Sequence, residues 1–254
     1  MGGTSVIETS RLTKRYGRLP VVEALDVRIR EGEVYGFLGP NGAGKSTTLL
    51  MLLGLTRPSS GTASVCGLDP TRDARRIKER VGYLPENVGF YDELTARESL
   101  EYMAELNGIG RGESRARIRE ALETVGLDED EVRGKTVGAF SRGMKQRLGI
   151  AEVLVKEPRV LFLDEPTLGL DPDGARRIVE LVGRLNRERG ITVLLSSHQL
   201  EQVQRVSTRV AMMVRGRLVA EGAIDDLAGD RFGVGGGSAT LEEVYMKHFQ
   251  ESGS

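Results

Sequence analysis

Short runs of apolar residues, each followed directly by polar residues, are the clearest pattern along the chain. They occupy Val34–Leu38, 160–163 and 191–195. Runs of this length that are apolar throughout are typical of strands buried on both faces of a parallel sheet. Because open α/β sheets bind ligands at the carboxyl ends of their strands, the three polar ends predict one shared site.

The middle of the chain has helical patterns without obvious strands. Thr95 and Glu98 have the spacing of a capping box ahead of a helix over 100–106. Further helices are expected over 115–125 and 144–155. We therefore expect a helical subdomain inserted into an α/β core with a mainly parallel sheet.

Two glycines predict where helices end. Gly126 follows the expected helix over 115–125. Asp171 is favoured as an N-cap, and Pro172 is favoured at the first helical position. Another long helix should therefore begin there. That helix should end near Gly190.

The overall composition restricts the classes of partner. The 254 residues include 36 Lys and Arg against 37 Asp and Glu, for a net charge of −1. Proteins that rely on broad attraction to phosphate backbones are usually more basic, so we expect no nucleic-acid partner. Cys66 is the single cysteine, which excludes an internal disulfide and a thiol metal cluster.

The chain also lacks a sequence pattern for entering a membrane. Its most apolar stretch, residues 49–55, is far shorter than the ~20 residues that span a bilayer. The first residues lack the charged and then apolar pattern of a secretion signal. We therefore expect a soluble chain, and any membrane-spanning part must come from another polypeptide.

A glycine-rich segment between the first apolar run and a helix-prone stretch over 47–53 fits the phosphate-binding loop G-x-x-x-x-G-K-[ST]. Its glycines let backbone N–H groups surround phosphate oxygens, and the following helix adds its positive end. Lys45 can reach the β- and γ-phosphates, and the Ser46 hydroxyl can bind Mg²⁺. The expected phosphate-binding residues are Gly39, Pro40, Asn41, Gly42, Ala43, Gly44, Lys45, Ser46 and Thr47.

The other two apolar runs end in residues suited to hydrolysis. Asp164 suits Mg²⁺, directly or through water, and Glu165 suits polarising an attacking water. A lone acidic pair often only caps a strand, but the phosphate loop earlier in the chain favours the catalytic interpretation. His198 follows the third run and can contact a γ-phosphate, although such a histidine alone more often caps a helix. We assign His248 no role.

Taken in order, these motifs resemble the nucleotide-binding subunit of ATP-binding-cassette (ABC) transporters over about residues 5–228. The resemblance makes Tyr16 the ring that stacks on adenine and His198 the switch histidine. Asp171 falls in the loop that crosses between subunits. The segment from Phe140 to Arg147 occupies the place of the family signature, with Ser141 and Gly143 retained.

Two departures from the family pattern indicate which branch of the family the chain resembles. The signature usually reads Leu-Ser-Gly-Gly-Gln, whereas here it reads Phe140-Ser-Arg-Gly-Met144. Glu86 stands where the family generally has glutamine, and a carboxylate can bind Mg²⁺ or accept from water but has no amide to donate. Both variants resemble the ABC-2 exporter branch, which moves drugs, polysaccharides, lipids or haem-related cargo; one lineage serves copper-site maturation. The cargo is not readable from the chain.

The resemblance implies a P-loop NTPase fold of the RecA-like type, with an N-terminal antiparallel β region and an inserted helical subdomain. The expected division is a nucleotide-binding α/β core over 1–86 and 157–230, and a helical signature subdomain over 87–156. The last expected unit, over 231–254, holds a glycine-rich linker over 233–238 and a C-terminal helix over 241–249. The linker is either a natural loop or an artificial replacement of a longer segment.

The resemblance also implies a mechanism. Two copies would pair head to tail around two ATP molecules, with Ser46, Glu86 and Asp164 around Mg²⁺. Glu165, His198 and Lys45 would be the catalytic residues of each site. Ser141 and Gly143 would come from the partner copy, and Ser141, Arg142, Gly143 and Asp171 would form the dimer interface. The pair would power export by a separate integral membrane permease, so the chain would lie in the cytoplasm on the inner face of the cell membrane.

Residues 86–94 are a candidate docking surface for that permease, because Phe90 and Tyr91 are the aromatic anchors that interfaces favour. The alternative, that both rings pack between the subdomains, is equally open.

Two other classes of protein remain. One is an ABC ATPase that is not tied to transport: an iron–sulfur cluster assembly ATPase is possible by length, while a single cassette without zinc cysteines or long coiled coils disfavours ribosome-associated and DNA-repair members. The other is a P-loop kinase, which the signature and the switch histidine disfavour.

Overall fold

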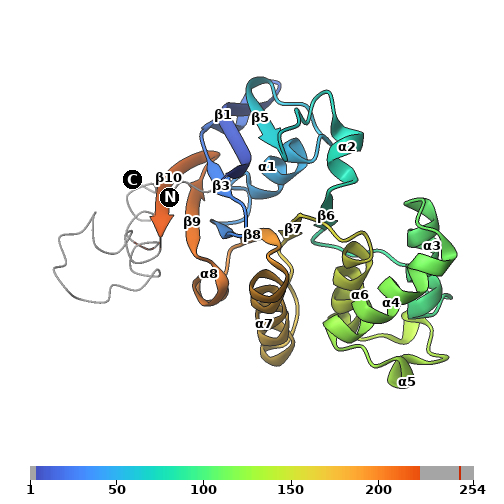
Figure 1. The fold of residues 1–254 in the computed structure, drawn as a ribbon. Helices are drawn as coiled ribbons and strands as arrows, with labels where there is room; N and C mark the ends of the chain where they lie inside the picture. The colour runs from blue at the N-terminus through green and yellow to red at the C-terminus, as the bar shows by residue number, and fades with distance from the viewer. Residues whose placement is uncertain (1–3, 224–245, 247–254) are drawn as a thin grey trace.

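A six-stranded sheet forms the centre of the computed structural model, which describes residues 4–223 and residue 246 (Figure 1). Its strand order is β10-β9-β4-β8-β7-β6, and every neighbouring pair is parallel except β9 and β10. The strands are β4 (Val34–Leu38), β6 (Val81–Leu84), β7 (Val160–Asp164), β8 (Thr192–Ser197), β9 (Arg209–Val214) and β10 (Arg217–Ala223). The three apolar runs are therefore three adjacent central strands.

Alternate residues of these strands pack into different cores, which is why the runs are apolar throughout. On β7, Leu161 and Leu163 join the core on the side of the long helices. Phe162, between them, joins the core on the opposite side. A strand buried on both faces favours apolar side chains along its length, and a polar side chain inside it must be hydrogen-bonded.

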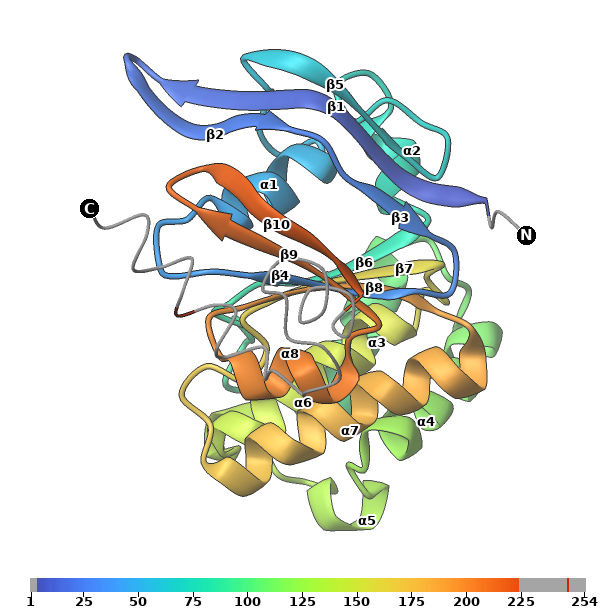
Figure 2. The same cartoon turned by 90° about the vertical axis from the view of Figure 1, so that its left-hand side faces the viewer.

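The antiparallel region lies on one side of this sheet, and the longer helices lie on the other (Figure 2). The region consists of β1 (Ser5–Tyr16), β2 (Leu19–Leu25), β3 (Arg28–Arg30) and β5 (Ser60–Val65). Each of the last three pairs antiparallel with β1. Helices α1 (Lys45–Leu52) and α2 (Ala74–Lys78) accompany it, while α7 (Pro172–Arg189) and α8 (Leu200–Val206) cover the opposite face.

The remaining helices gather at one end of the molecule (Figure 1). They are α3 (Ala96–Leu106), α4 (Arg111–Val125), α5 (Glu129–Val132), the 3-10 turn η1 (Val137–Ala139) and α6 (Arg142–Leu154). Thr95 and Glu98 form the expected capping box, with Thr95 Oγ1 accepting from the Glu98 amide at 3.2 Å. The helical subdomain over 87–156 stays a prediction.

The differences from the expected elements have local causes. Helix α4 begins at Arg111 rather than residue 115, and β8 extends to Ser197 rather than stopping at residue 195. Serines inside β8 lower its apolar pattern, although both are buried. The short helices α2, α5 and α8 have too few turns to produce a clear period. The expected linker over 233–238, the helix over 241–249 and His248 lie outside the described residues, apart from residue 246.

Candidate nucleotide site

The phosphate loop joins β4 to α1 and is held against neighbouring backbone. Gly44, the N-cap of α1, has a φ of 102°. A Cβ built on Gly44 would lie 2.6 Å from the Val21 carbonyl oxygen, and one built on Gly39 would lie 2.2 Å from the Met213 oxygen. Only glycine fits such approaches. Helix α1 begins at Lys45, two residues before the expected start, which brings Lys45 and Ser46 into its first turn.

The Lys45 ammonium group lies inside the site, with 5% of its side chain exposed. Nζ donates to the Gly39 carbonyl oxygen at 2.7 Å and to the Pro40 oxygen at 3.2 Å. It also lies 3.2 Å from Glu165 Oε1. The buried ammonium is thus held at the end of the loop by two carbonyl oxygens and one carboxylate oxygen.

The Asp164 carboxylate accepts hydrogen bonds from hydroxyl groups on two other elements. Ser46 Oγ, in α1, donates to Asp164 Oδ1 at 3.0 Å. Ser196 Oγ, in β8, donates to the same oxygen. The site therefore joins the ends of β4, β7 and β8, as the polar ends of the apolar runs predicted.

Glu165 is buried, 5% exposed, and has the left-handed φ of 47°. Its amide donates to both the carbonyl oxygen and Oγ of Ser196, each at 3.1 Å. Its carboxylate lies between two groups: Oε1 faces Lys45, and Oε2 lies 2.9 Å from His198 Nδ1. The structure thus joins Lys45, Glu165 and His198, which the sequence placed far apart.

The oxygen groups at this point fit Mg²⁺ in chemical type. A serine hydroxyl and an aspartate carboxylate meet at 3.0 Å, and Mg²⁺ commonly takes one or two such protein oxygens together with phosphate oxygens. Within residues 4–223 and 246, no group of three or more His, Cys, Asp and Glu side chains could hold a metal by itself.

Glu86 lies just beyond β6, the strand next to β7, and is exposed. The pKa of the Tyr83 phenol is raised to about 12, first by burial and then by the negative charges of Asp164 and Glu86. Both acids therefore act electrostatically on the same phenol. Direct contact between Glu86 and the Ser46–Asp164 pair is not among the hydrogen bonds of the described residues.

The signature segment forms a second, separate surface. Ser141 is the N-cap of α6, and its Oγ accepts from the Met144 amide at 3.2 Å. Together with residues 169–171 and the start of α7, it lines a hollow of about 380 Å³. Arg142 packs against Gly169 of the same chain, since a Cβ on Gly169 would lie 2.4 Å from the guanidinium. Within the described part of the chain, no hydrogen bond joins Ser141, Arg142 or Gly143 to the phosphate loop.

Two further expected residues lie at the edges of these surfaces. Asp171 is the N-cap of α7, as expected, with Oδ1 accepting from the Gly174 amide at 3.0 Å. Tyr16 ends β1 and is 55% exposed. Lys14 Nζ lies 4.9 Å from the centre of the Tyr16 ring, so one face of the ring already has a cation over it.

The two aromatic residues of the candidate docking surface differ from each other. Phe90 packs against the core of the helical region. Tyr91 is 55% exposed and meets Tyr102 of α3 edge to face, with ring centres 5.7 Å apart. Only Tyr91 is therefore available as an exposed anchor.

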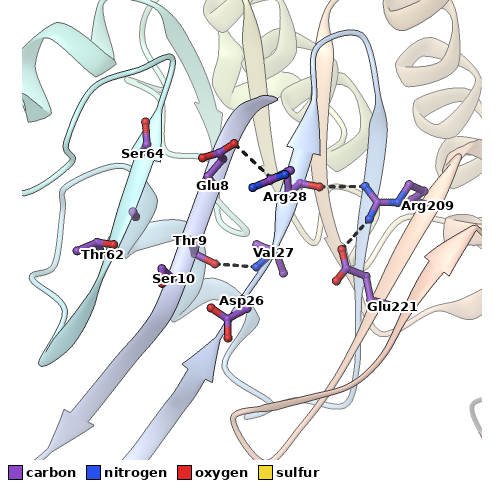
Figure 3. Close-up of a pocket in the computed structure, with 11 residues that line it drawn as sticks. Glu8, Thr9, Ser10, Asp26, Val27, Arg28, Thr62, Ser64, Arg209 and Glu221 are labelled. Carbon is purple, nitrogen blue, oxygen red and sulfur yellow. Dashed lines mark hydrogen bonds and ion pairs between the residues drawn. The ribbon is translucent and has the colours of Figure 1, made fainter. Parts of the chain in front are cut away.

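A polar hollow of about 540 Å³ lies away from the phosphate loop, between the antiparallel region and the β9–β10 hairpin (Figure 3). Four of its charged side chains pair with one another: Arg209 with Glu221 at 2.8 Å, and Arg28 with Glu8 at 3.3 Å. The fifth, Asp26, accepts from the Arg11 amide at 2.6 Å. Since none of the nucleotide motifs contributes to its lining, we do not assign the nucleotide to this hollow.

Ser196 was not among the residues expected in the site, although it contacts both acids. The sequence shows Ser196 directly after the apolar run over 191–195. Only the strand pairing of Asp164 with Ser196 reveals the contact. The helices of the described residues include none long and apolar enough to cross a bilayer.

Comparison with known proteins identifies the family. Residues 22–168 match the family model described as ABC transporter. The bacitracin transport ATP-binding protein of Bacillus licheniformis is 43% identical over 88% of this chain and 72% of its own length. A daunorubicin resistance ATP-binding protein of Streptomyces coeruleorubidus is 41% identical over 87% of this chain and 70% of its own length.

Solved structures agree with this match. A structure described as the ATP binding subunit of an ABC transporter has a TM-score of 0.83 and 31% identity, covering 95% of this chain and 98% of the other. A dimeric ATP-binding cassette bound to ADP and Pi has a TM-score of 0.75 and 25% identity, covering 85% and 98%. The chain has the same P-loop α/β cassette, and it belongs to the ABC transporter family as an ATP-binding, ATP-hydrolysing subunit.

Proposed function

We propose that two copies of this chain bind two ATP molecules head to tail with Mg²⁺ and power export through a separate permease of the ABC-2 type. The chain would act on the cytoplasmic side, at the inner face of the cell membrane. The observation that carries the proposal is the separation of the signature surface from the phosphate loop of the same chain. The signature can then reach a nucleotide only on another copy.

Gly143 supports this arrangement. A Cβ built on Gly143 would find its nearest neighbour, Leu170 Cδ2, only at 4.0 Å, and the backbone has no positive φ there. The chain's own packing therefore leaves room for a side chain at this position. A glycine is needed if a phosphate from another copy must approach the backbone N–H, with the Ser141 hydroxyl beside it.

Each residue of the core has a proposed role toward ATP. The exposed face of Tyr16 would stack on adenine, and the backbone from Gly39 to Thr47 would surround the phosphates. Lys45 would turn from its carbonyl partners to the β- and γ-phosphates, which need the same charge-assisted donors. Ser46, Asp164 and Glu86 would hold Mg²⁺ directly or through water, and the ion would neutralise charge on the phosphates.

The chemistry of hydrolysis would depend on Glu165. Its buried carboxylate would accept a hydrogen bond from the attacking water and polarise it toward the γ-phosphorus atom. His198, which lies against Glu165 Oε2, would orient that carboxylate and sense the γ-phosphate. Most of the catalysis would be positioning and electrostatic stabilisation rather than covalent chemistry.

Export is supported by what the relatives are called. The similar proteins include the bacitracin transport protein and ATP-binding proteins of linearmycin and daunorubicin resistance. These names favour a transporter subunit over an iron–sulfur assembly ATPase or a kinase. The exposed Tyr91, beside Tyr102, is the proposed permease anchor within the docking surface over 86–94.

The decisive experiment compares the parent with Glu165→Gln by light scattering, with and without ATP and Mg²⁺. The amide keeps the shape of the side chain but is a far weaker base, so turnover should fall by ~10²–10⁴-fold while ATP binding persists. A trapped dimer that appears only with ATP is the expected result. Turnover of Glu165→Gln at the parental rate would reject the assignment of the base, and tight ATP binding without dimerisation would reject the head-to-tail pair.

A further inference from the structure

Ser196 lies at the junction of the three strands that form the nucleotide site. It is fully buried, at 0% exposure. In the sheet it pairs with Phe37 of β4 on one side and with Asp164 of β7 on the other. A polar side chain in the middle of such a sheet has a desolvation penalty unless it is hydrogen-bonded.

Its hydroxyl makes two complementary hydrogen bonds. Oγ donates its proton to Asp164 Oδ1 and accepts the Glu165 N–H at 3.1 Å. A serine hydroxyl has one donor and two acceptor lone pairs, so both bonds can exist together. One small group therefore fixes the carboxylate of the first acid and the backbone of the second.

The backbone that it fixes is unusual. Glu165 has a φ of 47°, a conformation that non-glycine residues adopt only when their surroundings impose it. The Ser196 carbonyl oxygen and Oγ both accept the Glu165 N–H, which pins the peptide in that conformation. The result is that the Glu165 carboxylate reaches Lys45 and His198 rather than continuing along the strand direction.

We propose that Ser196 is a positioning residue for ATP hydrolysis, whose hydroxyl sets the relative orientation of Asp164 and Glu165. It does not touch the nucleotide. Its effect passes through the two acids, so the inference rests on the roles proposed for them above. Partners of this kind behind metal-binding carboxylates commonly affect affinity or activity by ~10–100-fold.

The test compares Ser196→Ala with a matched control on the same strand. Thr192 is also 0% exposed, and its Oγ1 accepts from the Gly32 amide at 2.9 Å, at the far end of β8 from the acids. Thr192→Val removes a buried hydroxyl without touching the site. Both variants should lower the melting temperature by a few degrees, because each removes the hydrogen bonds made by a buried hydroxyl.

Only Ser196→Ala should change the chemistry. We expect kcat to fall by ~10–100-fold with the KM for ATP within ~3-fold of the parent, since the phosphate loop is unchanged. Equilibrium binding of ATP gives a second readout that does not depend on turnover. In EDTA the affinity should match the parent. The gain in affinity on adding Mg²⁺ should shrink, because Asp164 then keeps only the hydrogen bond from Ser46.

Three outcomes would overturn the proposal: a kcat within twofold of the parent, an unchanged gain in affinity with Mg²⁺, or an equal loss of kcat in Thr192→Val. Glu165→Gln, measured in parallel, separates this failure from that of the proposed function. If Glu165→Gln abolishes turnover while Ser196→Ala leaves it intact, the base stands and the positioning role fails. If Ser196→Ala lowers kcat and the Mg²⁺ gain while Glu165→Gln retains turnover, the positioning of Asp164 stands and the base fails.

Discussion

Gly44 and Gly143 both lie in segments expected to approach the ATP phosphates, but the chain itself requires glycine only at the first. Gly44 has a φ of 102°, and a Cβ there would lie 2.6 Å from the Val21 oxygen. At Gly143 the nearest atom to a Cβ is 4.0 Å away, and the φ is not positive. The first glycine is explained by folding, whereas the second needs an explanation outside the chain.

The neighbouring side chains differ in the same way. Lys45, Asp164 and Glu165 are all buried and contact one another or shared hydroxyl groups. Ser141 is exposed, and its hydroxyl accepts only from the amide of its own helix among the described contacts. The core edge, defined by Lys45, Asp164 and Glu165, is thus assembled within one chain. The signature surface over 141–143 is the one that we propose meets another copy.

The sharpest test of this comparison is Gly143→Val. The side chain should fit the folded chain but prevent close approach of a phosphate, so ATP turnover should fall by ~10²–10³-fold, the effect of losing a donor to a developing charge. ATP affinity of the single chain should stay within twofold of the parent. Turnover and equilibrium binding, with melting temperature to confirm folding, are the measurements.

Gly44→Val is the matched control for that variant. It places the same side chain against the Val21 oxygen, so both the melting temperature and ATP affinity should fall. If Gly143→Val behaved like Gly44→Val, the signature glycine would be a folding requirement. The distinction between the two surfaces would then be lost.

The next prediction concerns the core edge alone. Lys45→Ala should weaken ATP binding by ~10–100-fold, because charge-assisted hydrogen bonds to the phosphates disappear. It also leaves the buried Glu165 carboxylate without its cation, which should lower the melting temperature. Lys145→Ala is the control: Lys145 pairs with Asp92 at 2.9 Å beside the signature surface, so its loss should leave ATP affinity unchanged. Equal losses in both variants would contradict the separation of the two surfaces.

Some features of the molecule could be predicted from the sequence, and others could not. The meeting of Ser46 with Asp164, and of Lys45 with Glu165, followed from motifs at the carboxyl ends of parallel strands, because the sheet leaves those ends only one edge to share. The capping residues Thr95 and Asp171 were equally predictable, since their partners lie three residues away.

Features that depend on strand register or on packing between distant segments were not predictable. The contact of Ser196 with both acids requires knowing which residues of β7 and β8 are opposite each other. Phe90 and Tyr91 are adjacent and chemically similar, yet one is packed and the other exposed. No local pattern in a loop decides which of two neighbouring rings faces inward.

A smaller effect is expected at Tyr16, the proposed contact for adenine. Tyr16→Ala should weaken ATP binding by about 10-fold, since stacking on an aromatic ring contributes ~1–3 kcal/mol. Binding of inorganic triphosphate should not change, because it has no base to stack. Leu19→Ala is a useful control, as Leu19 lies opposite Tyr16 in the hairpin and is 66% exposed. A parallel loss of triphosphate binding in Tyr16→Ala would show instead that the hairpin shapes the phosphate loop.

The smallest predicted effect lies at the other end of the helix that presents the signature. Burial raises the pKa of the Glu152 carboxyl in α6 to about 7, while the positive charge of Lys156 opposes the shift. Lys156 Nζ in turn donates to the Lys78 and Val81 oxygens at 3.0 and 3.1 Å, at the start of β6. Because the folded pKa is raised, the folded state binds this proton more tightly than the unfolded chain, and stability falls as pH rises from about 4.5 to 7.

Glu152→Gln should remove that pH dependence. The variant should be more stable than the parent by about 1–2 kcal/mol at pH 8, after allowing for partial exposure of the group, and the difference should shrink toward pH 5. Urea unfolding at the two pH values measures it. Glu157→Gln, at a carboxylate that is 61% exposed and paired with Arg117, is the matched control for removing a carboxylate from the surface. ATP affinity at the core edge should be the same in both variants, because Glu152 anchors only the helix that carries the signature; a change in affinity would mean that the two surfaces are coupled within one chain.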